Sequence, residues 1–233
     1  MTRVIAGAAR GRRLAVPPGR LTRPTSDRAR EGLFATLTAI RGPLAGAGVL
    51  DLYAGSGAVG LEALSRGAAR VLFIEADPRA ARVIKENAAV VGLPGGTVVT
   101  GRVERVLARG PDWTARGSGG PAADAGAAAA GGAAADGGAG SGGGAGDGQA
   151  AEGYDLAVAD PPYAAGDDEV TGMLALLAGR GWLAPGALVA VERATRSGPL
   201  RWPPGYVPDR SRRYGEATFW YGHAAGIGRA GTT

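Results

Sequence analysis

The sequence predicts an α/β fold with a mostly parallel sheet, helices on both faces and an antiparallel C-terminal strand. Three observations support this prediction. Short apolar runs alternate with helical patterns along most of the 233 residues. Glycine or polar residues follow directly after several of these runs, where open α/β sheets bind ligands. The last run, RRYGEATFWYG, alternates as an antiparallel strand does.

The individual elements follow from local signals. The helix expected over 78–91 starts with Pro78 and stops at Gly92, which are favoured positions for these two residues. The strand expected over 154–160 must leave its ladder at Pro161 and Pro162, because proline has no N–H to donate. The expected strands are 48–53, 70–77, 97–101, 154–160, 187–192 and 212–222, and the expected helices are 57–66, 78–91, 103–109 and 168–177.

The segment 115–152 interrupts this pattern. About three-quarters of it is alanine and glycine, and it has no aromatic or large aliphatic residue. Such a composition cannot offset the entropy of ordering, so we predict a disordered insertion. The strands on either side belong to one series, which predicts a single domain, 23–233, preceded by an arm, 1–22.

Positive charge is concentrated near the N-terminus. Residues 1–41 hold nine arginines against Asp27 and Glu31, a net charge of +7, so the remainder of the +5 chain carries −2. Clustered arginines favour a polyanion such as nucleic acid, although a solvated basic face is the alternative. The expected phosphate contacts are Arg10, Arg12, Arg13 and Arg23.

Other site types are disfavoured by composition. The chain has no cysteine and one histidine, His223, which argues against disulfides, thiolate or histidine metal sites and a histidine dyad. We therefore expect no metal. No apolar run suits a membrane span or a secretory signal, so we expect a cytoplasmic protein.

The loop DLYAGSGAVG, 51–60, carries three glycines in G-x-G-x-x-G spacing. Glu75 lies 20 residues after Gly55, at the end of the next expected strand. This pattern serves any adenosine-containing ligand. Asp51 would repel a pyrophosphate but would favour the sulfonium and ammonium of S-adenosylmethionine, which we therefore prefer to a nicotinamide cofactor or to a turn without a ligand.

The predicted cofactor site extends over three strand ends. After the third strand, a backbone amide and an apolar side chain could contact adenine, and the nearest acid, Glu104, either joins them or faces solvent. The residues assigned to the site from their positions are Asp51, Tyr53, Ala54, Gly55, Ser56, Gly57, Glu75, Ala76, Arg102 and Val103.

The sequence DPPY, 160–163, follows the expected strand 154–160. An exocyclic aromatic amine is a poor nucleophile because its lone pair is conjugated with the ring. Asp160 and the Pro161 carbonyl could accept its two hydrogens, the stiff Pro161–Pro162 turn would fix their direction, and Tyr163 would stack on the base. An ordinary strand exit with a packed tyrosine is the alternative.

These motifs occur together with RVIAGAARGRRL, 3–14, and RPTSDRAREGLF, 23–34. In combination they resemble the bacterial small-subunit (16S) ribosomal RNA guanine-N2 methyltransferases, which are class I S-adenosylmethionine-dependent enzymes. The resemblance implies a Rossmann-like seven-stranded sheet and a small β-rich arm that contacts RNA. It also implies that Thr25 and Arg28 contribute to the cofactor pocket, on a helix that packs through Leu33, Phe34 and Leu37, although Arg28 and Glu31 could instead form a surface pair.

The resemblance implies methyl transfer from S-adenosylmethionine to N2 of a guanine in 16S ribosomal RNA, free or within the assembling small subunit. Asp160, Pro161, Pro162 and Tyr163 would be the catalytic group, and we expect a monomer. The rival hypotheses are another amino-methyltransferase acting on a different RNA guanine or on adenine N6, a nicotinamide-dependent oxidoreductase, and a non-catalytic RNA-binding protein.

Overall fold

The structure is a computed structural model that describes residues 2–17, 27–111 and 153–225. The predicted disordered insertion 115–152, Arg23 and Thr25 lie outside these ranges. Within them, no helix is long and apolar enough to cross a membrane.

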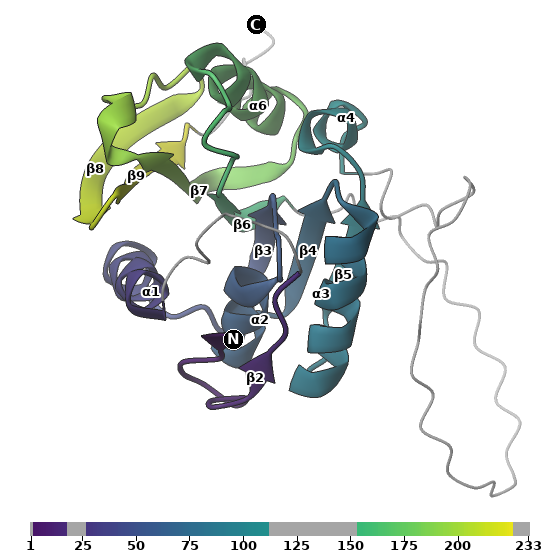
Figure 1. The fold of residues 1–233 in the computed structure, drawn as a ribbon. Helices are drawn as coiled ribbons and strands as arrows, with labels where there is room; N and C mark the ends of the chain where they lie inside the picture. The colour runs from purple at the N-terminus through teal and green to yellow at the C-terminus, as the bar shows by residue number, and fades with distance from the viewer. Residues whose placement is uncertain (1, 18–26, 112–152, 226–233) are drawn as a thin grey trace, which may run out of the picture.

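A seven-stranded sheet forms the centre of the molecule, in the order β5-β4-β3-β6-β7-β9-β8 (Figure 1). The first five of these strands in space are parallel, and β9 and β8 are antiparallel to their neighbours. The strands are β3 (Gly48–Leu52), β4 (Arg70–Glu75), β5 (Gly96–Thr100), β6 (Tyr154–Ala159), β7 (Leu183–Ala194), β8 (Tyr206–Tyr214) and β9 (Ala217–Ala224). The predicted α/β class, the seven strands and the antiparallel end are confirmed.

The sheet separates two apolar cores. One core contains side chains of α1, α2 and α3, and the other contains side chains of α4 and α6. The helices are α1 (Asp27–Arg41), α2 (Ala58–Ser65), α3 (Pro78–Val91), α4 (Val103–Ala108) and α6 (Asp167–Gly179), with a short 3-10 helix at Thr195–Ser197. Leu33, Phe34 and Leu37 of α1 are fully buried, as predicted from the sequence.

The antiparallel end is confirmed, but the bounds expected for one strand, 212–222, enclose a turn, and RRYGEATFWY belongs to a closing hairpin, as the family resemblance implies. Two strands, β8 and β9, form a hairpin there, and Gly215 turns the chain between them with a φ of 66°. A left-handed backbone at this position favours glycine. The alternation of apolar and polar residues continues on both sides of Gly215, which is why 212–222 is expected as one strand. β7 is also longer than expected, because it continues on both sides of the apolar run 187–192.

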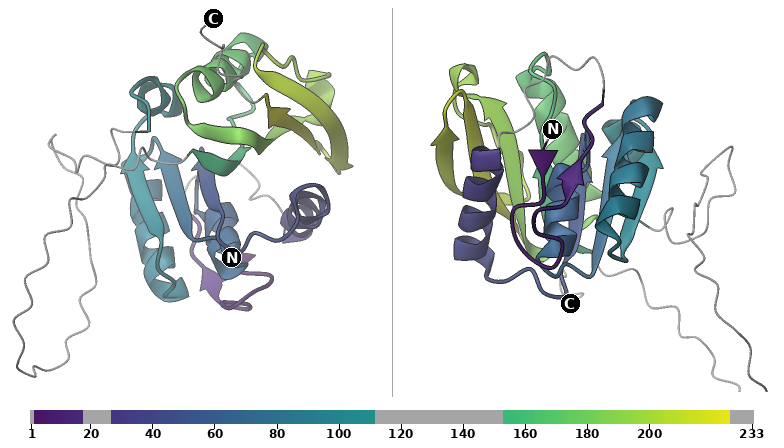
Figure 2. Two further views of the ribbon diagram at one scale, coloured as in Figure 1. Left: turned by 180° about the vertical axis from the view of Figure 1, so that it is seen from behind. Right: turned by 60° about the horizontal axis from the view of Figure 1, so that its bottom comes forward.

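The N-terminal arm is a small two-stranded sheet, β1 (Thr2–Arg3) with β2 (Arg13–Leu14). It lies over α2, between α1 and α3 (Figure 2). Val4, Ala9 and Leu14 bury their side chains in the core shared with these helices. The described part of the arm, residues 2–17, is therefore packed onto the main domain.

Candidate functional site

The glycine loop connects β3 to α2, and every second residue from 53 to 57 has a left-handed backbone conformation. Tyr53, Gly55 and Gly57 have φ values of 59°, 59° and 75°. The Gly57 amide donates to the Ala54 carbonyl at 2.7 Å, which closes the loop as α2 begins. A left-handed non-glycine residue such as Tyr53 is uncommon and often occurs at functional sites.

Asp51 lies on β3 below this loop and is 3% exposed. Its Oδ2 accepts a hydrogen bond from the Gly60 amide in α2 at 2.9 Å. The pKa of Asp51 is raised to about 8, mainly by burial; the Gly60 hydrogen bond opposes this shift, and the carboxylates of Asp160 and Glu75 add to it. The buried acid is thus poised to stabilise a cation placed beside it.

Glu75 ends β4 and supports the backbone around the loop. Its Oε2 accepts from the Gly55 amide at 2.7 Å, and its Oε1 accepts from the Asp77 amide at 2.9 Å. Each carboxylate oxygen can accept a second hydrogen bond, so ribose hydroxyls remain chemically compatible with this side chain. Ala76, which follows it, is exposed.

The acids at the strand ends share one face of the sheet. Side chains alternate along a strand, and Val49, Phe73 and Val158 pack in the core of α1, α2 and α3. Asp51 and Glu75, and by continuation Asp160, project toward the same side. Such a concentration of negative charge fits the sulfonium and ammonium of S-adenosylmethionine. Among the described residues, no cluster of acids or histidine could hold a metal ion.

The end of β5 adds a polar contact that the sequence left open. Glu104 Oε1 accepts a hydrogen bond from the Tyr53 hydroxyl at 2.8 Å, and Arg102 Nε lies 3.8 Å from Glu104 Oε2. Burial, followed by Glu104, raises the pKa of Tyr53. Val103 packs in the core with α4 and α6. Glu104 therefore links the ends of β3 and β5 instead of facing only solvent.

The DPPY segment begins where β6 leaves the sheet. The Asp160 amide donates to the Leu52 carbonyl of β3 at 3.3 Å, and the Pro162 carbonyl accepts from the Ala165 amide at 2.8 Å. Asp160 is exposed, and Tyr163 is 53% exposed. The segment thus presents a carboxylate and an aromatic ring beside the glycine loop, because β6 is the neighbour of β3.

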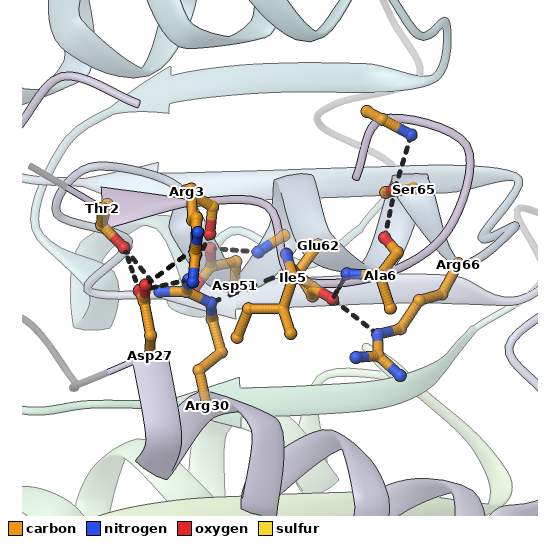
Figure 3. A network of polar contacts seen from close by, with 12 residues as sticks. Thr2, Arg3, Ile5, Ala6, Asp27, Arg30, Asp51, Glu62, Ser65 and Arg66 are labelled. Carbon is orange, nitrogen blue, oxygen red and sulfur yellow. Dashed lines mark hydrogen bonds and ion pairs between the residues drawn. The ribbon is translucent and has the colours of Figure 1, made fainter. Parts of the chain in front are cut away.

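A buried polar network that the sequence did not predict fixes the arm (Figure 3). Arg30 of α1 is 1% exposed and donates to Thr2 Oγ1 at 3.0 Å and to Asp27 Oδ1 at 2.9 Å. Glu62 of α2 is fully buried and accepts from the backbone amides of Ile5 at 2.6 Å and Ala6 at 2.9 Å. These side chains hold the arm against both helices.

Asn87 of α3 connects the arm to the glycine loop. Its Nδ2 donates to the Ser56 carbonyl at 2.9 Å and to the Ala15 carbonyl at 3.0 Å, and its Oδ1 accepts from the Ala15 amide. A buried asparagine on a helix gives no sequence signal for such a role. The contact couples the arm directly to the backbone of the loop.

A hollow of about 550 Å³ lies between the arm and the start of α1. Three arginines, Arg3, Arg10 and Arg28, line it together with Asp27 and Glu31. This position places Arg28 beside the arm, and it adds Arg3 to the predicted basic contacts. Of the other predicted contacts, Arg13 is exposed and Arg12 donates to the Val90 carbonyl at the end of α3.

Comparisons with known proteins agree with this geometry. A family model described as "Conserved hypothetical protein 95" matches residues 2–112 and 144–223. "Ribosomal RNA small subunit methyltransferase D" of Escherichia coli strain K12 is 31% identical over 93% of this chain and 87% of that protein. A solved structure named "Putative methyltransferase yhhF", also from Escherichia coli, is 28% identical and covers 97% of this chain and 98% of its own, with a TM-score of 0.69.

A solved hypothetical protein from Thermus thermophilus is similar over 95% of this chain and 98% of its own, at 29% identity and a TM-score of 0.64. Fold, site and comparisons together define a class I S-adenosylmethionine-dependent methyltransferase. More particularly, the chain belongs to the family described as Conserved hypothetical protein 95, that of ribosomal RNA small subunit methyltransferase D.

Proposed function

We propose that this chain transfers a methyl group from S-adenosylmethionine to the exocyclic N2 of a guanine in 16S ribosomal RNA of the small subunit. The observation that carries the proposal is the position of the DPPY segment. Asp160 and the exposed Tyr163 follow β6, directly beside the glycine loop of β3. The name of the Escherichia coli relative supports ribosomal RNA as the substrate.

The cofactor lies over the glycine loop in this proposal. S-adenosylmethionine supplies an electrophilic methyl group there. Asp51 stabilises its positive charge and Glu75 accepts from the ribose, while the amides of Gly60 and Gly55 hold these two carboxylates in place. Arg102 and Val103 lie at the end of β5 and contribute backbone and apolar contacts to the adenine. Thr25 remains a proposed contact outside the described residues.

The substrate amine is held at the end of β6. Asp160 accepts one amine hydrogen and is placed to take the proton that the nitrogen loses, and the Pro161 carbonyl accepts the other hydrogen. Pro162 stiffens the turn, and its carbonyl bond to Ala165 fixes where Tyr163 begins. The exposed ring of Tyr163 then stacks on the guanine.

The arm 1–22 and the hollow beside α1 contact the RNA backbone in this account. Arginine forks suit phosphate oxygens, and Arg3, Arg10 and Arg28 surround the hollow from two elements. Arg13 extends this surface, while Arg12 and Arg23 are further proposed contacts. We infer a cytoplasmic, monomeric enzyme with one domain, 23–233, that acts on the RNA of the small subunit.

The test uses Asp160→Ala with labelled S-adenosylmethionine and small-subunit RNA. Methyl incorporation should fall by about 100-fold or more, because an amine-positioning group contributes at least this much to catalysis. Cofactor affinity, measured by calorimetry, should change by less than about threefold, since Asp51 and the glycine loop remain. Wild-type turnover in the variant would remove Asp160 from its assigned role.

A further inference from the structure

Glu192 of β7 is the cross-strand neighbour of Asp160. The register of the parallel β6–β7 pair ends with Ala159 opposite Val191, and its continuation by one residue beyond the end of β6 places Asp160 opposite Glu192. Neighbouring strands are about 4.8 Å apart. The two carboxyl groups therefore leave the sheet from adjacent positions at the same edge.

The two side chains also project to the same face. Val158 of β6 and Ala190 of β7 both pack in the core of α1, α2 and α3. Two residues further along each strand, alternation returns the side chain to that face. Glu192 thus belongs to the face that carries Asp51, Glu75 and Asp160, one strand further from the cofactor loop.

The charge of Glu192 acts on the proposed stacking ring. Burial raises the pKa of the Tyr163 phenol, and the carboxylates of Glu192, Asp160 and Glu216 raise it further. Glu192 is 5% exposed and is therefore buried at the end of the sheet. The adjacent Arg193 is directed to the opposite side, where its Nη2 donates to Asp167 of α6 at 2.7 Å.

The chemistry of guanine explains why a second acid would stand here. Guanine presents two neighbouring donors on one edge, the N2 amine and N1–H, whereas adenine has an acceptor at N1. An ionised carboxylate only accepts hydrogen bonds. Two adjacent carboxylates can therefore accept both guanine donors. With adenine, the N1 lone pair would face a carboxylate and would have no hydrogen-bond donor.

We propose that Glu192 accepts the N1–H of the target guanine while Asp160 holds its N2 amine, which makes Glu192 the residue that selects guanine. This inference rests on the proposed function, since it concerns the same base. It adds a specificity-determining residue from β7 to a site otherwise built from β3, β4, β5 and β6.

The test compares two RNA substrates that differ only at the target base. One carries guanosine and the other 2-aminopurine, which keeps the 2-amine but has a lone pair in place of N1–H. The wild-type enzyme should prefer guanosine by roughly 100-fold or more in kcat/KM, as sites built around a hydrogen bond do. In Glu192→Gln, whose amide can donate to the lone pair, this ratio should fall at least about tenfold.

Glu216→Gln is the matched control. Glu216 is exposed in the turn between β8 and β9, and its charge also acts on Tyr163, but it does not lie opposite Asp160. The Glu216→Gln variant should prefer guanosine to 2-aminopurine as strongly as the wild-type protein does. Cofactor affinity by calorimetry and the melting temperature of each variant show that the fold and the cofactor site are intact.

A second variant, Glu192→Asp, covers the case in which Glu192→Gln does not fold. It keeps the carboxylate but shortens the side chain, so guanosine turnover should fall while the preference for guanosine persists. The inference is overturned if Glu192→Gln keeps the wild-type preference for guanosine over 2-aminopurine, or if Glu192→Asp loses that preference. Asp160 would then be the acceptor of both guanine donors. Failure of the wild-type protein to make N2-methylguanosine would instead refute the proposed function.

Discussion

Replacing Asp51 by asparagine should stabilise the cofactor-free protein. Burial raises the pKa of Asp51 to about 8 from 3.8, so the folded state holds a proton that the unfolded state releases between these values. The contribution of this group to stability is therefore greatest below pH 4 and declines as pH rises toward 8. At pH 7 the penalty amounts to about 4 kcal/mol as an upper bound.

Asparagine removes this penalty because it needs no proton, and its Oδ1 can still accept from the Gly60 amide. We expect Asp51→Asn to unfold at higher denaturant concentration than the wild-type protein at pH 8, by about 1–4 kcal/mol, and to show a flatter pH dependence between pH 5 and 8. Chemical denaturation across this pH range measures both.

The same substitution should weaken cofactor binding. A sulfonium or ammonium beside Asp51 lowers its pKa, so binding at pH 7 should release close to one proton in the wild-type protein. Calorimetry in buffers of different ionisation enthalpy counts that proton. Asp51→Asn should release none and should bind about 10–100-fold more weakly, as loss of a charge-assisted contact predicts. Equal proton release in both proteins, or a less stable variant at pH 8, would refute the reasoning.

Three further predictions concern packing, the arm and the RNA. Gly60→Ala should destabilise by about 1–3 kcal/mol because its Cβ would lie 2.3 Å from a core phenylalanine ring, whereas Gly172→Ala, which meets nothing within 4 Å, should be neutral or slightly stabilising in thermal denaturation. Glu62→Gln should cost about 3 kcal/mol in denaturant unfolding, because the Arg66 guanidinium, 2.8 Å from Glu62, loses its carboxylate and one amide oxygen cannot replace both acceptors of the Ile5 and Ala6 amides; a loss under 1 kcal/mol would argue against that role. Arg10→Ala and Arg28→Ala should raise the KM for RNA without changing the KM for S-adenosylmethionine. Each should also reduce the slope of log RNA affinity against log salt concentration by about 1. A changed KM for S-adenosylmethionine in Arg28→Ala would instead support the cofactor role first predicted for Arg28.

The alternation of strands and helices could be predicted from the sequence because each element carries its own local signals. The helix 78–91 illustrates this, since Pro78 and Gly92 mark its ends and the structure places it at Pro78–Val91. The positions of Asp51, Glu75 and Asp160 at strand ends follow from the same pattern. Because side chains alternate between the two faces along each strand, these three side chains are also expected on the same face of the sheet.

Contacts between distant segments could not be predicted in the same way. Arg30 and Glu62 read as ordinary surface residues of amphipathic helices, and only the packing of the arm across both helices buries them. The role proposed for Glu192 follows from the β6–β7 register, which depends on strand order and not on local sequence. Arg28 was assigned to the cofactor by resemblance, and the position of the arm associates it with the basic hollow.

One measurement tests the central claim most directly. Small subunits or their RNA, taken from cells that lack this enzyme, are incubated with the protein and labelled S-adenosylmethionine, digested to nucleosides and separated by mass spectrometry. The account predicts one labelled product, N2-methylguanosine, which is absent when Asp160→Ala replaces the wild-type protein. Label in N6-methyladenosine or in another nucleoside, or RNA binding without any label, would contradict it.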